Sequence, residues 1–320
     1  MMDKESYQSF RKVIETEGNA VHSFSIKGSP MSDYARESFT QLMRSRLAKR
    51  PDLADQLIPN FAPGCRRLTP GPGFLEALTE DNVDFITTPI RAIVPKGVLL
   101  EDGRVVELDV LVCATGFDVM AAPPWPIIGL DGKDLKSRYD PYPEAYMSTA
   151  IDGFPNFFAM LGPNSGAASG SLTRMMEGVA EYIVKCIRKL QKEDIAAMHV
   201  SPRSVRDWVG FVDAYFSKTV FIDDCKTWYR KDNRIFGLWP GTTLHAIEVL
   251  KSPRWEDFIY VHADEHNPNL NRLAWMGNGF TEAHLNGGDI AYYIDPEHVD
   301  FPSHPLPENT DRWSKVAFSH

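Results

Sequence analysis

Apolar residues recur at helical spacing in two long stretches of the chain. In the longer stretch, from Leu172 to Leu190, they stand three or four residues apart over about five turns. The other stretch begins at Ser201-Pro202, a cap residue followed by a first-turn proline, and repeats apolar positions through Phe216. Each pattern predicts an amphipathic helix that buries one face.

Shorter patterns predict further helices nearer the N-terminus. We expect helices over residues 3–17 and 33–49, the second with Ser32 and Asp33 as candidate caps. A connection rich in proline and glycine follows, and a short helix is expected after it, over residues 74–80.

Four other stretches predict strands. Val83–Thr87 is one, and the pattern from Ile90 to Val106 predicts two or three short strands with Asp102-Gly103 as a hairpin turn of the primed type. Val110–Cys113 is a run of consecutive apolar residues, mostly β-branched or small, which is typical of a central strand in a parallel sheet buried on both faces. A similar run over Phe157–Leu161 predicts a further strand.

Two of these strand-like runs end on small residues. Thr115 and Gly116 follow the first, and Gly162-Pro163-Asn164 follows the second, shortly before the long helix. In open α/β sheets dinucleotides bind outside the carboxyl ends of strands, where small residues let the backbone approach the ligand. The pattern fits a cofactor crevice, and it also fits a core strand that leaves through a glycine turn into a core helix.

Composition and charge narrow the possible partners. The chain has 320 residues, of which 43% are hydrophobic and 24% charged, and its formal net charge is -9. The length suggests about two domains. Nucleic acids and anionic membranes require a basic footprint, so neither is expected as a partner. The N-terminus is polar and no run approaches the length of a membrane span, so we expect a cytoplasmic protein.

The metal-binding and nucleophilic residue types form no familiar cluster. The four cysteines, Cys65, Cys113, Cys186 and Cys225, are far apart and form no C-x-x-C pair, so a zinc ribbon or redox dithiol is not expected and a reducing compartment fits best. The nine histidines show no ligand spacing, which argues against a metal site. No G-x-S-x-G elbow appears, which removes the commonest hydrolase signature.

Four segments follow one another along the chain: DVLVCATGFD (109–118), FPNFFAMLGPN (154–164), CKTWYRKDNRIFGLWPGTTLHAIEVLKSPRWEDFIY (225–260) and NRLAWMGNGFTEAH (271–284). Taken in this order, they resemble the flavin-containing monooxygenases, and more closely the Baeyer–Villiger monooxygenases of fungal natural-product pathways. The resemblance extends from about Ser32 to Tyr293. It implies an α/β flavoprotein with two dinucleotide-binding domains, one for FAD and one for NADPH.

The resemblance also assigns parts of the chain to these domains. Residues 1–112 would be the C-terminal remainder of the NADPH-binding domain with a helical insertion, and residues 113–320 the C-terminal part of the FAD-binding domain with a family-specific tail. The residues at the cofactor crevice would be Thr115, Gly116, Phe117 and Asp118. Those that approach the flavin ring would be Gly162, Pro163 and Asn164. Trp228 matches a tryptophan that borders the nicotinamide cofactor in relatives.

A further segment, PGCRRLTPGPGFLEALTEDNV (63–83), contains the residue that the resemblance assigns as catalytic. Relatives of the Baeyer–Villiger type have two basic residues here, and the second, Arg67 in this chain, would be the catalytic arginine. In their reaction a flavin peroxide attacks a ketone, and negative charge persists until an ester or lactone forms. Arginine suits this task because it stays charged and offers several fixed donors. Without the neighbouring motifs, Arg66 and Arg67 would be interpreted as a solvated pair on a loop.

The sequence departs from this family in its phosphate-binding turns. A complete enzyme needs two G-x-G-x-x-G turns and carries the fingerprint F-x-G-x-x-x-H-x-x-x-W, and this chain has none of them. Gly71-Pro72-Gly73 and Gly277-Asn278-Gly279 lack the third glycine and the preceding strand. We therefore expect the chain to be incomplete at its N-terminus and to correspond to the C-terminal part of such an enzyme.

Three functions stay open. The first is a Baeyer–Villiger monooxygenase that acts on a small-molecule ketone and O2. Half of a nucleotide-binding fold would expose sheet edges, which either the remaining strands patch or a complementing chain covers. The second is a truncated, non-catalytic remnant or accessory protein of the same family. The third is an N- or S-oxygenating flavin monooxygenase, against which Arg67 argues because such enzymes do not share this arginine.

Overall fold

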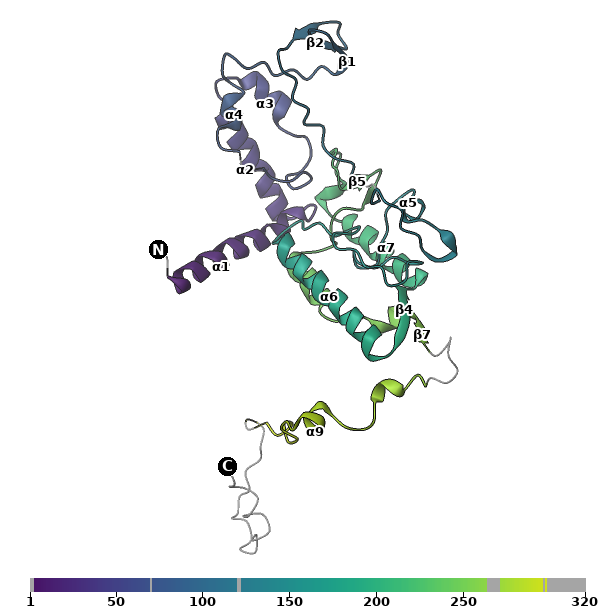
Figure 1. The fold of residues 1–320 in the computed structure, drawn as a ribbon. Helices are drawn as coiled ribbons and strands as arrows, with labels where there is room; N and C mark the ends of the chain where they lie inside the picture. Colours follow the sequence, from purple (N-terminus) through teal and green to yellow (C-terminus); the bar gives the residue numbers. More distant parts are fainter. Residues whose placement is uncertain (1–2, 70, 120–121, 264–270, 296, 298–320) are drawn as a thin grey trace, which may run out of the picture. The chain divides into compact units, whose positions relative to one another are not determined.

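The computed structural model describes residues 3–69, 71–119, 122–263, 271–295 and 297 (Figure 1). The chain divides into two compact units, residues 1–270 and residues 271–320. The predicted boundary between residues 112 and 113 concerns two nucleotide-binding domains and stays a prediction. No helix in the described part of the chain is both long and apolar enough to cross a membrane.

The first unit contains short and long elements in an irregular order. Up to residue 138 they are α1 (Lys4–Ala20), η1 (Val21–Ser25), α2 (Pro30–Arg46), α3 (Pro51–Leu57), α4 (Phe74–Ala77), β1 (Ile90–Val94), β2 (Gly97–Leu100), β3 (Val105–Glu107), η2 (Leu130–Gly132) and α5 (Leu135–Arg138). After residue 138 they are α6 (Leu172–Lys192), β4 (Ile195–Val200), α7 (Pro202–Phe216), η3 (Val220–Ile222), β5 (Arg230–Lys231), β6 (Arg234–Ile235), α8 (Thr243–Leu250), η4 (Trp255–Asp257) and β7 (Phe258–His262).

The helices α6 and α7 confirm the two strongest periodic patterns of the sequence. α6 packs against α8 and β4, and its buried face includes Met175 and Tyr182. The buried face of α7 includes Val205 and Trp208. Because these faces meet in one cluster of buried side chains, the main core of the chain lies around α6, α7 and α8.

The predicted caps of α2 are wrong by three residues. The helix begins at Pro30, and the Ser29 hydroxyl accepts a hydrogen bond from the Ser32 amide at 3.1 Å. Proline is favoured in a first turn because its missing amide would have no helical partner there. Ser29-Pro30 therefore forms the helix start, and Asp33 lies inside the first turn.

All three described sheets are antiparallel. β1, β2 and β3 form one, β4 pairs with β7, and β5 pairs with β6. The strands predicted between Ile90 and Val106 are confirmed as β1 to β3, but the primed turn at Asp102-Gly103 is wrong. The Leu100 carbonyl accepts from the Gly103 amide at 3.0 Å, and only Gly103 has a positive φ, of 86°. This is a three-residue loop closed by a left-handed glycine.

The predicted buried strand over Val110–Cys113 is wrong in this structure. Among the described residues no strand pairs with the run, and Val110 and Val112 are 76% and 82% exposed. A strand exists only through hydrogen bonds to a neighbouring strand, so an apolar run without such a neighbour stays extended and open to solvent.

Two other predicted strands fail for the same reason. Val83–Thr87 lies outside every described strand. Within Phe157–Leu161, one antiparallel bridge joins Phe158 to Ala150, and the Ala159 amide donates to the Thr149 carbonyl at 2.7 Å. The segment around Ala150 is too short to pair with the whole run, so it forms a single bridge and no continuous strand ladder.

The described residues of the second unit form short elements, η6 (Ala274–Met276) and α9 (Glu282–Asn286). Thr281 caps α9 in a capping box with His284, and Gly287 ends it in a left-handed conformation. None of the described residues of this unit is buried.

Candidate functional site

One cavity brings together residues that lie far apart in the sequence. Its volume is about 620 Å³, and five of the predicted site residues line it: Arg67, Asp118, Gly162, Pro163 and Trp228. The rest of the wall is mainly apolar and aromatic, and it includes the first residue of α6, Leu172. A concave, largely apolar cavity of this size with a few polar groups is typical of small-molecule sites.

A short hairpin seats Trp228 in the wall of the cavity. Phe236 and Gly237 both donate their amides to the Tyr229 carbonyl, at 3.0 and 3.1 Å, which closes the β5–β6 hairpin behind the indole. A Cβ on Gly237 would lie 2.5 Å from the Tyr229 Cβ and 3.1 Å from the Trp228 ring. The hairpin therefore needs a glycine at residue 237, chiefly to leave room for Tyr229 beside the tryptophan.

The Gly162-Pro163-Asn164 turn is hydrogen-bonded to the same hairpin through Asn164. Its side-chain amide donates to the carbonyls of Ile235 and Leu238 at 2.9 and 3.2 Å, and the side chain is buried. Asn164 is not among the residues that line the cavity. Gly162 and Pro163 thus reach the cavity wall, while Asn164 anchors them from behind.

Arg67 approaches Trp228 from a different part of the chain. Its guanidinium carbon lies 5.5 Å from the centre of the indole ring, which is within the range of a cation–π interaction. Arg67 is exposed, and it also lines two neighbouring cavities of about 300 and 790 Å³. The guanidinium can therefore be reached by a ligand from more than one side.

The first glycine-containing turn reaches the cavity with one of its predicted residues. Asp118 lines the cavity, whereas Thr115, Gly116 and Phe117 do not. Phe117 is 92% exposed, and a Cβ on Gly116 would meet nothing within 4 Å. In the described part of the chain no backbone or side chain requires the small residues of this turn.

Several residues of the cavity wall were missed by the sequence analysis. The aromatic members are Trp125, Tyr139, Phe157 and Phe236. Trp125 stands inside the proline-rich segment APPWP, and an aromatic residue among turn formers was the available signal. Burial raises the pKa of Tyr139 to about 12, with Arg138 opposing the shift, so Tyr139 contributes a neutral hydroxyl at any ordinary pH.

The cysteine analysis is corrected by the structure. Cys65 and Cys225 form a disulfide, with 6.4 Å between their Cα atoms and a sequence separation of 160. Cys113 and Cys186 are free, the first exposed and the second buried. A pair so distant in sequence gives no spacing motif, and only the fold shows that the two thiols meet. In the described part of the chain no cluster of three or more His, Cys, Asp or Glu side chains could hold a metal ion.

The chain is similar in sequence to curated fungal enzymes. It is 36% identical over 298 residues to the FAD-binding monooxygenase tazF of Aspergillus terreus, covering 91% of this chain and 52% of the relative. It is 36% identical over 265 residues to the FAD-binding monooxygenase moxY of Dothistroma septosporum, covering 80% and 42%. The chain thus spans about half the length of the curated relatives it matches. No protein-family model matches it.

The fold is also similar to solved structures of Baeyer–Villiger monooxygenases. Cyclohexanone monooxygenase from Rhodococcus sp. Phi1 bound to NADP+ superposes with a TM-score of 0.66 at 24% identity, covering 82% of this chain and 52% of that one. This likeness supports the predicted fold class, a partial two-dinucleotide-binding-domain α/β flavoprotein.

Proposed function

Because the chain belongs to the FAD-binding monooxygenase family, we propose that it acts as part of a Baeyer–Villiger monooxygenase that converts a ketone into an ester or lactone. FAD and NADPH would be its cofactors and O2 its second substrate. The observation that carries the proposal is the cavity that Arg67, Asp118, Gly162, Pro163 and Trp228 line together. Sequence resemblance singled out these residues separately, from four segments that are far apart in the sequence.

The residues of the cavity fit the ring end of a flavin or nicotinamide cofactor. Trp228, Trp125 and Phe236 give flat apolar walls, and Gly162 and Pro163 bring backbone close to the space between them. The pyrophosphate has no glycine-rich turn in this sequence. We therefore assign to these residues the ring of the cofactor and the substrate, and we assign no phosphate contact.

The chemistry divides between the cofactor and the protein. When bound, FAD reduced by NADPH would supply the activated oxygen that inserts next to the ketone carbonyl. Arg67 would donate hydrogen bonds to the substrate oxygen, where negative charge develops. The contact with Trp228 holds the guanidinium close to the indole in the wall of the cavity. The apolar walls would exclude water, which strengthens that hydrogen bond.

The first experiment measures flavin binding by the purified chain. We expect visible flavin absorbance to co-purify or to appear after FAD is added and excess cofactor is removed by gel filtration. Absence of bound flavin under both conditions would contradict catalysis by this polypeptide and would favour a non-catalytic member of the family.

The second experiment removes the arginine. Arg67→Ala should lower ester or lactone formation by roughly 10²–10³-fold, the usual effect of losing one preorganised donor, while flavin absorbance stays the same. Arg66→Ala is the matched control, because Arg66 does not line this cavity. Ketone oxygenation that survives in Arg67→Ala would remove the assigned role, and oxygenation of amines or sulfides alone would favour the N- or S-oxygenating alternative.

A further inference from the structure

The disulfide joins the two loops that carry the paired site residues. Cys65 stands two residues before Arg67, and Cys225 stands three residues before Trp228. Cys65 and Cys225 are 0% and 5% exposed, so the bond lies inside the protein while the arginine two residues away is exposed. A covalent link at this position fixes the distance between the two loops from which Arg67 and Trp228 project.

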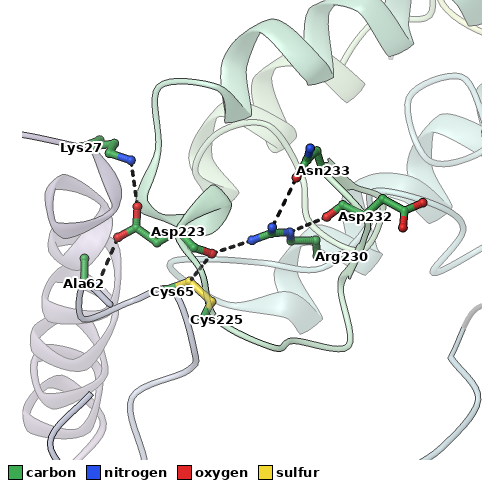
Figure 2. Close-up of a disulfide and its surroundings, with 8 residues drawn as sticks. All are labelled: Lys27, Ala62, Cys65, Asp223, Cys225, Arg230, Asp232 and Asn233. Carbon is green, nitrogen blue, oxygen red and sulfur yellow. Dashed lines mark hydrogen bonds and ion pairs between the residues drawn. A yellow bond between two sulfur atoms is a disulfide. The ribbon is translucent and has the colours of Figure 1, made fainter. Parts of the chain in front are cut away.

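Asp223 gathers three segments around the same bond (Figure 2). Its carboxylate accepts from the Lys27 ammonium at 2.9 Å and from the Ala62 amide at 3.2 Å. Its carbonyl accepts from the Arg230 guanidinium at 2.5 Å. The Ala62 hydrogen bond therefore joins the same two parts as the disulfide, whereas the Arg230 bond lies within the segment that carries Cys225 and Trp228.

The Arg67 loop has few other anchors. Between residues 59 and 69 the buried residues are Ala62 and Cys65, and no regular element is described between α3 and α4. Ala62 is held by Asp223 and Cys65 by the disulfide. Such a loop has many conformations available to it, and a crosslink restricts them by removing chain entropy.

We propose that the Cys65–Cys225 disulfide and the Asp223 carboxylate together form a clamp that positions Arg67 against Trp228, so that the arginine of the site responds to the redox state of this cysteine pair. The clamp itself does not depend on the reaction catalysed. Its effect on ketone oxygenation rests on the proposed function.

Both redox states are compatible with the surroundings of the pair. Closing the S–S bond removes two protons and two electrons from the thiols, and hydrogen peroxide, as oxidant, takes them up to give two molecules of water. A dithiol reverses the step and is itself oxidised to a cyclic disulfide. The Cys65 sulfur lies 3.7 Å from the Asp223 carbonyl oxygen, so a thiol at this place has an acceptor. Reduction therefore loosens the loop and leaves the Asp223 hydrogen bonds to hold it.

The bond is tested by counting thiols in the full chain. Denatured without reductant, the protein should show two free thiols, from Cys113 and Cys186, and four after reduction. Peptide mapping without reductant should recover the segments around Cys65 and Cys225 as one crosslinked species. Four free thiols in protein prepared without reductant, under air and after peroxide treatment, would overturn the proposal.

The positioning role is tested by trypsin cleavage after Arg66 and Arg67 in the native protein. Reduction, or the double variant Cys65→Ser/Cys225→Ser, should speed this cleavage several-fold, while cleavage after Lys12 in α1 keeps its rate. Cys113→Ser, which removes an exposed free thiol, is the matched control and should change neither rate. If the double variant does not fold, reduction of the folded wild-type protein gives the same comparison. Equal cleavage rates in the two redox states would overturn the clamp.

A spectroscopic signature separates positioning from general loosening. The emission of Trp228, obtained as the difference between the parent and Trp228→Phe, should change in Arg67→Ala and should change in the same direction when the wild-type protein is reduced. Arg66→Ala should leave it unchanged. A redox-insensitive Trp228 emission would overturn the positioning role even where the disulfide is present. A clamp that passes these tests in a chain that binds no flavin would leave the clamp intact and remove the proposed function.

Discussion

Two apolar stretches of this chain, α6 and the run over Val110–Cys113, differ sharply in how far their side chains are exposed to solvent. In α6 the valine at residue 179 is 3% exposed and packs in the main core. In the run over Val110–Cys113, Val110 and Val112 are 76% and 82% exposed. The residue types are alike, so hydrophobicity by itself does not explain the difference.

The difference lies in where each element finds its hydrogen-bond partners. A helix satisfies its own backbone and needs one apolar neighbour, which α8 and β4 supply to α6. A central strand needs a strand on each edge and a layer on each face. Among the described residues no strand pairs with Val110–Cys113. Local patterns are therefore sufficient for the helical core and insufficient for a sheet whose neighbours must come from elsewhere.

The largest expected effect on stability comes from truncating a buried aromatic residue of the main core, and an exposed aromatic residue shortly after Val110–Cys113 serves as the comparison. Trp239 is 1% exposed, packs 5.0 Å from Trp208 and donates to His245 at 3.0 Å. Trp239→Ala should lower the free energy of unfolding by about 3–5 kcal/mol, because it leaves a cavity and an unpaired imidazole. Phe117→Ala, at a residue that is 92% exposed, should change it by less than about 0.5 kcal/mol. Urea unfolding measures both, and equal costs would refute the contrast.

A smaller effect should come from acid, through a carboxylate beside the packed region. Burial favours the neutral form of Asp257, but hydrogen bonds from Tyr146, Arg254 and Ser204 outweigh it and lower its pKa. A lowered folded-state pKa stabilises the fold above the unfolded value near 4, and this stabilisation is lost as the pH falls through the lowered value.

Asp257→Asn should therefore cost about 1–2 kcal/mol at pH 7 and narrow the stability difference between pH 7 and pH 3. Asp207→Asn, at an exposed position on α7, is the control and should have no measurable effect on either quantity. Denaturant unfolding at the two pH values checks this. An unchanged pH profile in Asp257→Asn would assign the acid sensitivity to another group.

The smallest effect on stability should come from labelling the free cysteines. Cys113 lies in the exposed run, and Cys186 lies in the core, where burial raises the pKa of its thiol to about 12. A thiol reagent should label Cys113 rapidly without changing the melting temperature, and should label Cys186 only as the protein unfolds. Fast labelling of both in the native protein would show that the core around α6 opens as readily as the exposed run.

The sequence predicts parts of this structure well, for reasons that are physical. The spacing of apolar residues gave α6 and α7, since their contacts repeat every three or four residues along one chain. It failed for Val110–Cys113, because a strand is defined by partners that no window of sequence contains. The sequence pattern also misplaced the start of α2, because both Ser29 and Ser32 are possible caps and the helix begins after Ser29.

The candidate site was predictable where residues carry recognisable chemistry in recognisable surroundings. Arg67 and Trp228 came from family resemblance, and the structure brings them within contact of each other. Asn164 was assigned to the cofactor, yet its amide is used to hold the turn against β6. The disulfide between Cys65 and Cys225 could not be predicted from the sequence, because no pattern around either cysteine identifies its partner.

The disulfide also sets an order of events during synthesis. A ribosome releases the chain from its N-terminus, so Cys65 emerges long before its partner 160 residues later. Cys113 and Cys186 both emerge in that interval as competing thiols. The native pairing is therefore selected by the completed fold, because Cys65 can pair with Cys225 only after the segment that contains Cys225 has been translated, and any earlier pairing with Cys113 or Cys186 must exchange.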